Sequence, residues 1–166
     1  MKYIRSNVMK SIEVSIEISE KIFQLRNEFL NKSRNQYLAE PIFYSLGKII
    51  NGYDRVLGIA DIDAYSYGYN FIFGIAGYRI ALVFLKRLRP EFWGEEHDKH
   101  KFLKRILKEC LHELGHTFGL RHCRNPRCVM KFSNTIMDTD FKRAAFCINC
   151  SRRLEVSGIK VYSKIV

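Results

Sequence analysis

The segment CLHELGHTFGLRHC, residues 110–123, constrains this chain more than any other part of its sequence. It holds three of the protein's five histidines together with a glutamate, two glycines and two cysteines. An α-helix turns by about 100° per residue, so His112 and His116 lie about 40° apart around its axis and Glu113 about 100° from His112. We therefore expect the three side chains to share one face of a helix.

This spacing fits a zinc site with an open position. Two imidazoles one helical turn apart can chelate one zinc ion, and the glutamate between them can reach a water molecule on that metal. Gly119 permits the left-handed turn that ends a helix, which lets His122 return to the same ion as a third nitrogen ligand. Three protein ligands leave the fourth position for water, as in catalytic sites. The alternative, ordinary histidines on an amphipathic helix, does not explain why Glu113, Gly119 and His122 all fall in register.

The cysteines form a second pattern. Cys110 lies in the apolar stripe of the same helix, so we expect it to be a small buried hydrophobic side chain. The other four follow the spacing Cys-x4-Cys, eighteen residues and Cys-x2-Cys, and they are Cys123, Cys128, Cys147 and Cys150. Two closely spaced pairs are typical of a closed tetrahedral zinc site, with disulfides as the alternative.

The two predicted zinc sites are adjacent in the sequence. Cys123 directly follows His122, and neighbouring side chains usually point in different directions, so the two residues can bind different ions. The second zinc would then hold the third ligand of the first in place. Replacing Cys147 and Cys150 together should therefore weaken zinc binding at the histidines as well as the stability of the fold.

Together these motifs resemble the archaemetzincin (archaelysin) family of zinc metalloproteases. HExxHxxGxxH runs straight into Cys-x4-Cys-x-Met and is followed by Cys-x-x-Cys, here HELGHTFGLRHCRNPRCVM and CINC. The resemblance covers about the last third of the chain, with a weaker likeness upstream in RVLGIADID and FIFGIAG. By this resemblance the site residues are His112, His116 and His122 as catalytic zinc ligands, Glu113 as general base and acid, and Cys123, Cys128, Cys147 and Cys150 as ligands of a structural zinc. Met130 would form the Met-turn beneath the catalytic metal, and Met137 is expected in the core.

The resemblance also implies a fold. We expect a metzincin-like single domain of α/β (α+β) class over residues 1–166, with an upper part of about 1–119 and a lower part of about 120–166. It would consist of a twisted mixed sheet, backing helices, the active-site helix and a small zinc-stapled C-terminal part. An extended substrate would lie antiparallel to an edge strand, for which FIFGIAG and RIALVFL are the candidates.

Hydropathy patterns predict the elements of such a fold. The expected ranges are a strand over 12–18, a helix over about 19–31, a helix from Pro41 to 51–52, a strand in 55–63, a hairpin of strands in 71–76 and 79–88, and a helix over 98–118. The apolar stripe of the last helix comprises Leu103, Ile106, Leu107, Cys110, Leu111, Leu114 and Phe118. The polar and aromatic stretch 61–69 is predicted to be a solvated loop, with the lining of a cleft as the alternative.

Composition limits the class of protein. With 166 residues and 47% hydrophobic content, the chain can form one compact domain. We expect no membrane span, since the apolar stretches are interrupted, and no secretory signal, since the N-terminus lacks an apolar core. The expected location is therefore the cytoplasm and the expected state a monomer. The net charge of +11 favours a solvated basic surface, with nucleic-acid binding as the less favoured alternative.

The predicted function is zinc-dependent hydrolysis of peptide bonds, with two zinc ions per chain, a zinc-activated water and Glu113 as the base. One alternative is a zinc-dependent endoribonuclease, which shares the H-x3-H-x5-H spacing but usually lacks the glutamate and the four cysteines. The other is a two-zinc binding module without catalysis. A peptide or protein is the expected partner.

Overall fold

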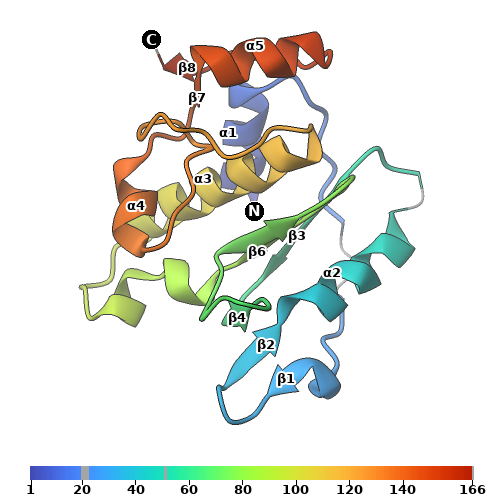
Figure 1. Cartoon of the computed structure of the whole chain (residues 1–166), viewed down its shortest axis with the longest axis vertical. Coiled ribbons are helices and arrows are strands. Elements are labelled where there is room, and N and C mark those ends of the chain that lie inside the picture. The colour runs from blue at the N-terminus through green and yellow to red at the C-terminus, as the bar shows by residue number, and fades with distance from the viewer. Residues whose placement is uncertain (20–22, 51, 166) are drawn as a thin grey trace.

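The computed structural model describes residues 1–19, 23–50 and 52–165 (Figure 1). Its α-helices are α1 (Lys2–Ser11), α2 (Ala39–Leu46), α3 (Lys99–Thr117), α4 (Ile136–Phe141) and α5 (Ile148–Val156). Its strands are β1 (Leu30–Asn31), β2 (Gln36–Leu38), β3 (Val56–Ala60), β4 (Ala64–Tyr65), β5 (Gly74–Ala76), β6 (Ile80–Phe84), β7 (Phe146–Cys147) and β8 (Lys164–Ile165). Short 3-10 turns cover Asn27–Phe29, Gly47–Ile49, Lys86–Leu88 and Pro90–Trp93. Within the described ranges, no helix combines the length and apolar character needed to cross a membrane.

The central sheet has the order β3-β6-β5 and is mixed, as predicted. β3 runs parallel to β6, with Val56 opposite Ile80, and β5 runs antiparallel to β6. Successive side chains of a strand point to opposite faces. Val83 accordingly joins the core cluster that contains α3, whereas Leu82 and Phe84 join the cluster that contains α2. The sheet is therefore covered on both faces, which explains the continuous apolar run of β6.

Helix α3 crosses the middle of the molecule between the central sheet and the C-terminal segment that carries α4 and α5 (Figure 1). It begins after Asp98, whose carboxylate accepts a hydrogen bond from the Lys101 amide at 2.9 Å. It ends at Phe118, and Gly119 follows with a φ of +86°, the left-handed turn that its position predicts. The predicted helix over 98–118 is thus confirmed, and Cys110 is fully buried in its apolar stripe.

The smaller sheets lie at the two ends of the chain. β1, β2 and β4 form one sheet, in which β2 is antiparallel to β1 and parallel to β4. β7 and β8 pair in parallel beside α5. The N-terminal helix, α1, packs against α3. The division into an upper and a lower part stays a prediction.

Several predicted elements near the N-terminus were wrong. Residues 2–11 form a helix that was not predicted, and residues 12–18 are extended but form only one bridge, between Ile12 and Val161. Less and more exposed side chains alternate over 12–17, but Ile18 is 40% exposed, and among the described residues no neighbouring strand lies along this segment. Residues 23–26 are not helical, and 20–22 lie outside the described residues. A single period therefore identified the buried side without identifying the partner that makes a strand.

Two other details differ from prediction. The helix expected to begin at Pro41 begins two residues earlier, at Ala39, and Asn51 at its expected end lies outside the described residues. Met137, expected in the core, is 74% exposed on the surface of α4. This helix is only six residues long and buries Ile136 and Thr139, so Met137 falls on its outer side.

Candidate metal centres and cleft

Helix α3 and the turn after it bring His112, His116 and His122 together. Their ligand nitrogens all lie within 4.8 Å of one another. The ring centroid of His122 lies 5.3 Å from that of His112 and 4.8 Å from that of His116. The turn at Gly119 therefore returns the third histidine to the pair on the helix, as the spacing predicts.

The protonation of the two helical histidines follows from their hydrogen bonds. His112 Nδ1 donates to the Val129 carbonyl and His116 Nδ1 donates to the Leu120 carbonyl, each at 2.8 Å. A carbonyl oxygen only accepts, so each Nδ1 carries the proton and each Nε2 presents a lone pair. The two Nε2 atoms face each other at 3.1 Å. Lone pairs at this distance repel unless a cation binds both, and a tetrahedral zinc would hold its nitrogens about 3.4 Å apart.

Burial keeps these imidazoles neutral. It lowers the pKa of His112 well below its usual value, and nearby positive charge from Lys142 lowers it further. Burial is also the largest cause of the lowered pKa values of His116 and His122. Neutral imidazole is the form that binds metal, so the site suits a cation rather than a proton.

Glu113 lies between the helix and the edge strand β5. Only 5% of it is exposed, and burial raises the pKa of its carboxyl well above the usual range, with a further rise from the charge of Glu109. A Cβ at Gly74 of β5 would lie 2.5 Å from Glu113 Oε1. The side chain of Glu113 is thus packed directly against the backbone of the edge strand.

A buried ion pair lies one helical turn before Glu113. The ammonium of Lys142 is 3.0 Å from Glu109 Oε1, and the Thr139 hydroxyl donates to the same oxygen at 3.1 Å. The side chain of Lys142 is fully buried and that of Glu109 is 4% exposed. This pair connects the face of α3 that carries the histidines to the segment around α4.

Met130, which the resemblance assigns to a Met-turn, packs against α3 at Gly115. It is fully buried, and a Cβ at Gly115 would lie 2.4 Å from its sulfur. Gly115 precedes His116, so the methionine fills the space that a side chain at this position would need. A methionine side chain is flexible and its sulfur is polarizable, which suits it to fill an irregular gap beside the helix.

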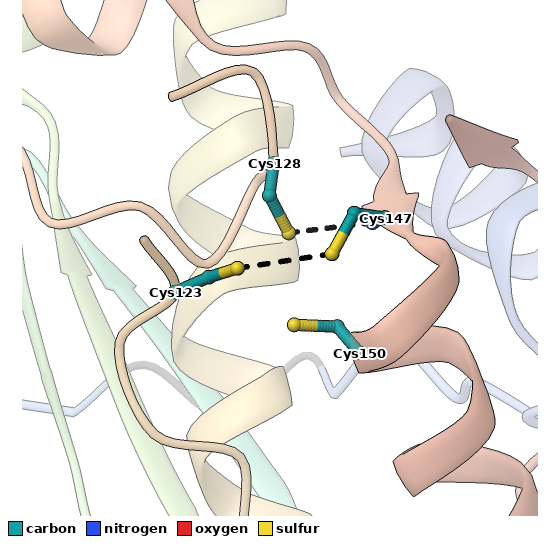
Figure 2. A group of neighbouring side chains, drawn as sticks. All are labelled: Cys123, Cys128, Cys147 and Cys150. Atoms are coloured by element: carbon teal, nitrogen blue, oxygen red, sulfur yellow. Dashed lines mark hydrogen bonds between the residues drawn. The ribbon is translucent and has the colours of Figure 1, made fainter. Parts of the chain in front are cut away.

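The four cysteines of the second pattern also converge. Figure 2 shows Cys123 and Cys128 on the loop after α3, with their sulfurs directed toward those of Cys147 and Cys150 at the start of α5. The four sulfurs all lie within 4.8 Å of one another, and the Cys123 and Cys147 sulfurs are 3.7 Å apart. A tetrahedral zinc with four thiolates would hold its sulfurs about 3.8 Å apart. No disulfide is formed by any of the five cysteines.

One member of the cysteine cluster, Cys128, favours the thiolate form. A hydrogen bond from the Cys150 thiol lowers the pKa of Cys128 to about 5, and the same pairing raises the pKa of Cys150. The backbone amide of Cys147 also donates to the Cys128 sulfur, at 3.3 Å. Thiolate is the form that binds metal, so one member of the cluster is already in that form at neutral pH.

A cleft of about 650 Å³ runs past the histidines. One wall is the segment 71–76, which ends in β5, and the opposite wall is the segment 132–134 that follows Met130. The rings of Tyr69 and Phe132 meet across the cleft, with centroids 6.4 Å apart, and Phe132 lies 4.9 Å from His122. From the polar and aromatic stretch 61–69, Ser66, Gly68 and Tyr69 line this cleft, while Asp63 is paired with Arg87.

Sequence reasoning missed several residues that shape the site. They are Gly74, Glu109, Gly115, Phe132 and Lys142. Their roles depend on contacts between segments far apart in the chain, and no motif marks them. Two of them stood as unassigned positions in quoted runs, Gly115 in HELGHTFGLRHCRNPRCVM and Gly74 in FIFGIAG.

Comparison with known proteins agrees with this geometry. A family model described as Peptidase family M54 matches residues 8–156. The archaemetzincin of Sulfolobus acidocaldarius is 40% identical over 157 residues, which cover 93% of this chain and 88% of that protein. The archaemetzincin of Pyrococcus furiosus is 52% identical over 126 residues, which cover 74% of this chain and 66% of that protein. A crystal structure of a zinc-dependent peptidase from Methanocorpusculum labreanum superposes with a TM-score of 0.76 and 31% identity, over 82% of this chain and 83% of that one. With a family model along most of its length and relatives at this level of identity, the chain belongs to peptidase family M54, the zinc metallopeptidases that include the archaemetzincins.

Proposed function

We propose that this chain hydrolyses peptide bonds at a zinc ion held by His112, His116 and His122, with Glu113 as general base and acid. The observation that carries the proposal is the pair of Nε2 lone pairs 3.1 Å apart beside a buried glutamate. When bound, zinc lowers the pKa of a coordinated water toward about 7 and polarises the carbonyl of the substrate.

The environment of Glu113 supports its proposed role in proton transfer. Burial raises its carboxyl pKa well above that of an exposed glutamate, which favours acceptance of a proton by this group. It would accept the proton at a carboxylate oxygen and pass it to the nitrogen of the leaving amine.

The edge of β5 supports an extended substrate. Among the described residues, β5 pairs with β6 alone, so its other edge leaves backbone groups for an added antiparallel strand. β6 is paired on both sides, and RIALVFL is therefore not available for this purpose. FIFGIAG is the better of the two candidate segments, because residues 71–76 line the cleft.

A second zinc ion at the four cysteines completes the proposed metal content of two per chain. The sulfur spacing of 3.7 Å and the thiolate character of Cys128 support this closed structural site. Reduced cysteines of this kind suit the cytoplasm, which we propose as the location. We further propose a metzincin-type arrangement, since Met130 packs against α3 at Gly115, directly before His116. We also propose that the protein is a monomer.

The lining of the cleft argues against an RNA substrate. The net charge of the chain is +11, yet no lysine or arginine is found among the described residues that line the cleft. Glu109 and Glu113 both line it. Three arginines instead surround a separate cavity beside the cysteines, namely Arg121, Arg124 and Arg153. A polyanion binds where positive charge is concentrated, so the cleft suits a peptide better than an oligonucleotide.

A peptide library, labelled RNA and metal analysis test the proposal together. We expect two zinc atoms per chain and cleavage of peptides that a chelator abolishes. Glu113→Gln should retain both zinc atoms and lose hydrolysis, by about 10²–10⁴-fold in kcat. Retained turnover in this variant would remove the glutamate from the mechanism. A noncatalytic module with no exchangeable position on its zinc would show no rise in melting temperature with a hydroxamate.

A further inference from the structure

The glycine at position 74 is explained by a side chain opposite it and not by its backbone. Gly74 lies in β5, paired with Val83 of β6 in a regular antiparallel register, and its φ is not positive. The backbone would therefore accept any residue. A Cβ at this position would, however, lie 2.5 Å from Oε1, 2.6 Å from Cγ and 2.7 Å from Cδ of Glu113.

A Cβ at position 74 would force the side chain of Glu113 to move. Only 5% of Glu113 is exposed, and the residue also lines the cleft. The three heavy atoms nearest to the Cβ position all belong to its distal half, which includes the carboxyl group. A methyl group at position 74 would therefore displace the carboxyl group from its place beside β5.

We propose that Gly74 is a positioning residue for Glu113. The inference rests on the proposed catalytic role of Glu113. By lacking a side chain, Gly74 lets the edge strand approach the helix closely enough to enclose the carboxyl beside the zinc ligands. The same strand would bind the substrate backbone, so Gly74 sets the distance between the general base and the peptide bond.

A thermal-stability cycle tests the contact without any assay of activity. Gly74→Ala in the otherwise unchanged chain should lower Tm by roughly 2–12 °C, because it overpacks the contact between β5 and Glu113. In a Glu113→Ala background the three opposing atoms are absent, and the same substitution should change Tm by less than about 2 °C. An equal loss of Tm in the two backgrounds would overturn the proposal. So would a failure of Gly74→Ala to fold in both backgrounds, whereas folding in the Glu113→Ala background alone would support it.

Gly77→Ala is the matched control. A Cβ at Gly77 would meet Phe43 Cζ at 2.8 Å and does not approach Glu113. Its effect on Tm should therefore be the same with and without the Glu113 side chain. A dependence on Glu113 as large as that of Gly74→Ala would mean that the cycle reports general loosening of the sheet.

The catalytic consequence is measured separately, on folded protein with its zinc content determined. Gly74→Ala should keep the wild-type zinc content and lower kcat at least tenfold, with a smaller change in KM, since Glu113 acts on the reacting water and not in substrate binding. Shortening the glutamate makes space for the methyl group, so adding Gly74→Ala to Glu113→Asp should lower kcat less than it does in the wild type. Wild-type kcat in the zinc-loaded Gly74→Ala protein would refute the positioning role. If the wild type itself lacks peptidase activity, the proposed function fails, while the stability cycle still decides whether the contact exists.

Discussion

Loss of the four-cysteine site should weaken zinc binding at the histidines. The carbonyls that fix the two helical histidines belong to Leu120 and Val129, in the loop that also carries Cys123 and Cys128. The Cys123 amide donates to the Met130 carbonyl at 2.9 Å, which closes this loop on itself. The perturbation is the double replacement of Cys147 and Cys150 by serine, which removes half of the cysteine ligands and leaves the loop sequence unchanged.

The magnitude follows from the number of orienting bonds at risk. Replacing one hydrogen-bond partner of a metal-bound histidine typically lowers metal affinity by about 10–100-fold. The loop supplies two such partners, through the carbonyls of Leu120 and Val129, and also carries the third ligand, His122. Loss of both partners corresponds to about 10²–10⁴-fold in affinity, or about 2.7–5.5 kcal/mol.

The assay is competition for zinc by a chelator of known affinity. Zinc release is measured at a temperature where the variant is folded, and far-ultraviolet circular dichroism monitors the fold in the same samples. The wild type should release its two zinc ions in separate steps, and the double variant should bind one ion with the reduced affinity. A control for general destabilisation is Ile42→Ala, which removes a buried side chain from the α2 side of the sheet, away from the loop.

Unchanged affinity at the histidines in the Cys147 and Cys150 double variant would refute this reasoning. It would mean that α3 and the local turn hold the histidines without help from the cysteine site. Equal loss of affinity in Ile42→Ala would also refute it, because the effect would then follow stability and not the loop.

Three further predictions concern packing and charge. Gly115→Ala would place a Cβ 2.4 Å from the methionine sulfur beneath the helix, so it should lower stability by about 1–3 kcal/mol in urea denaturation. Lys142→Met leaves the Glu109 carboxylate buried without its partner. It should lower the free energy of unfolding by about 3–5 kcal/mol, or Tm by roughly 6–20 °C. Adding Glu109→Gln should restore part of the loss. Burial raises the pKa of Asp140, but its two hydrogen bonds from Arg105 outweigh this and leave the pKa below 3.8. The resulting stability is present above pH 3.8 and is lost as pH falls through the lowered pKa, so Arg105→Gln should flatten the pH dependence of urea unfolding in that range.

The candidate site was more predictable than the fold around it. A helix fixes the angles between residues three and four apart, so His112, Glu113 and His116 could be placed on one face from their spacing alone. Gly119 marked the end of the same helix, and the turn there returned His122 as expected. These relations are local in the sequence, and local geometry is what a motif records.

The contacts that enclose the site are long-range and left no local signal. Glu109 and Lys142 are 33 positions apart, and Gly74 is in a strand that precedes Glu113 by 39 positions. Similarly, the alternation over 12–18 records which side chains are less exposed as far as Ile16, but a strand also needs a partner along its length. The residues that the sequence misplaced or missed are those whose role depends on a segment elsewhere in the chain.

The uninterrupted order of the histidine and cysteine motifs has a physical reason. Residues 118–135 contain no helix or strand, yet this segment supplies one proposed zinc ligand and both carbonyls that orient the other two. A loop without regular hydrogen bonding orders a side chain only if it is itself held in place, because each free residue retains about 1–2 kcal/mol of backbone entropy. Met130 against Gly115 fixes one point of the loop, and the sulfurs of Cys123 and Cys128 fix two more. A cysteine directly after the third histidine is thus the shortest way to transfer the rigidity of one metal site to the other.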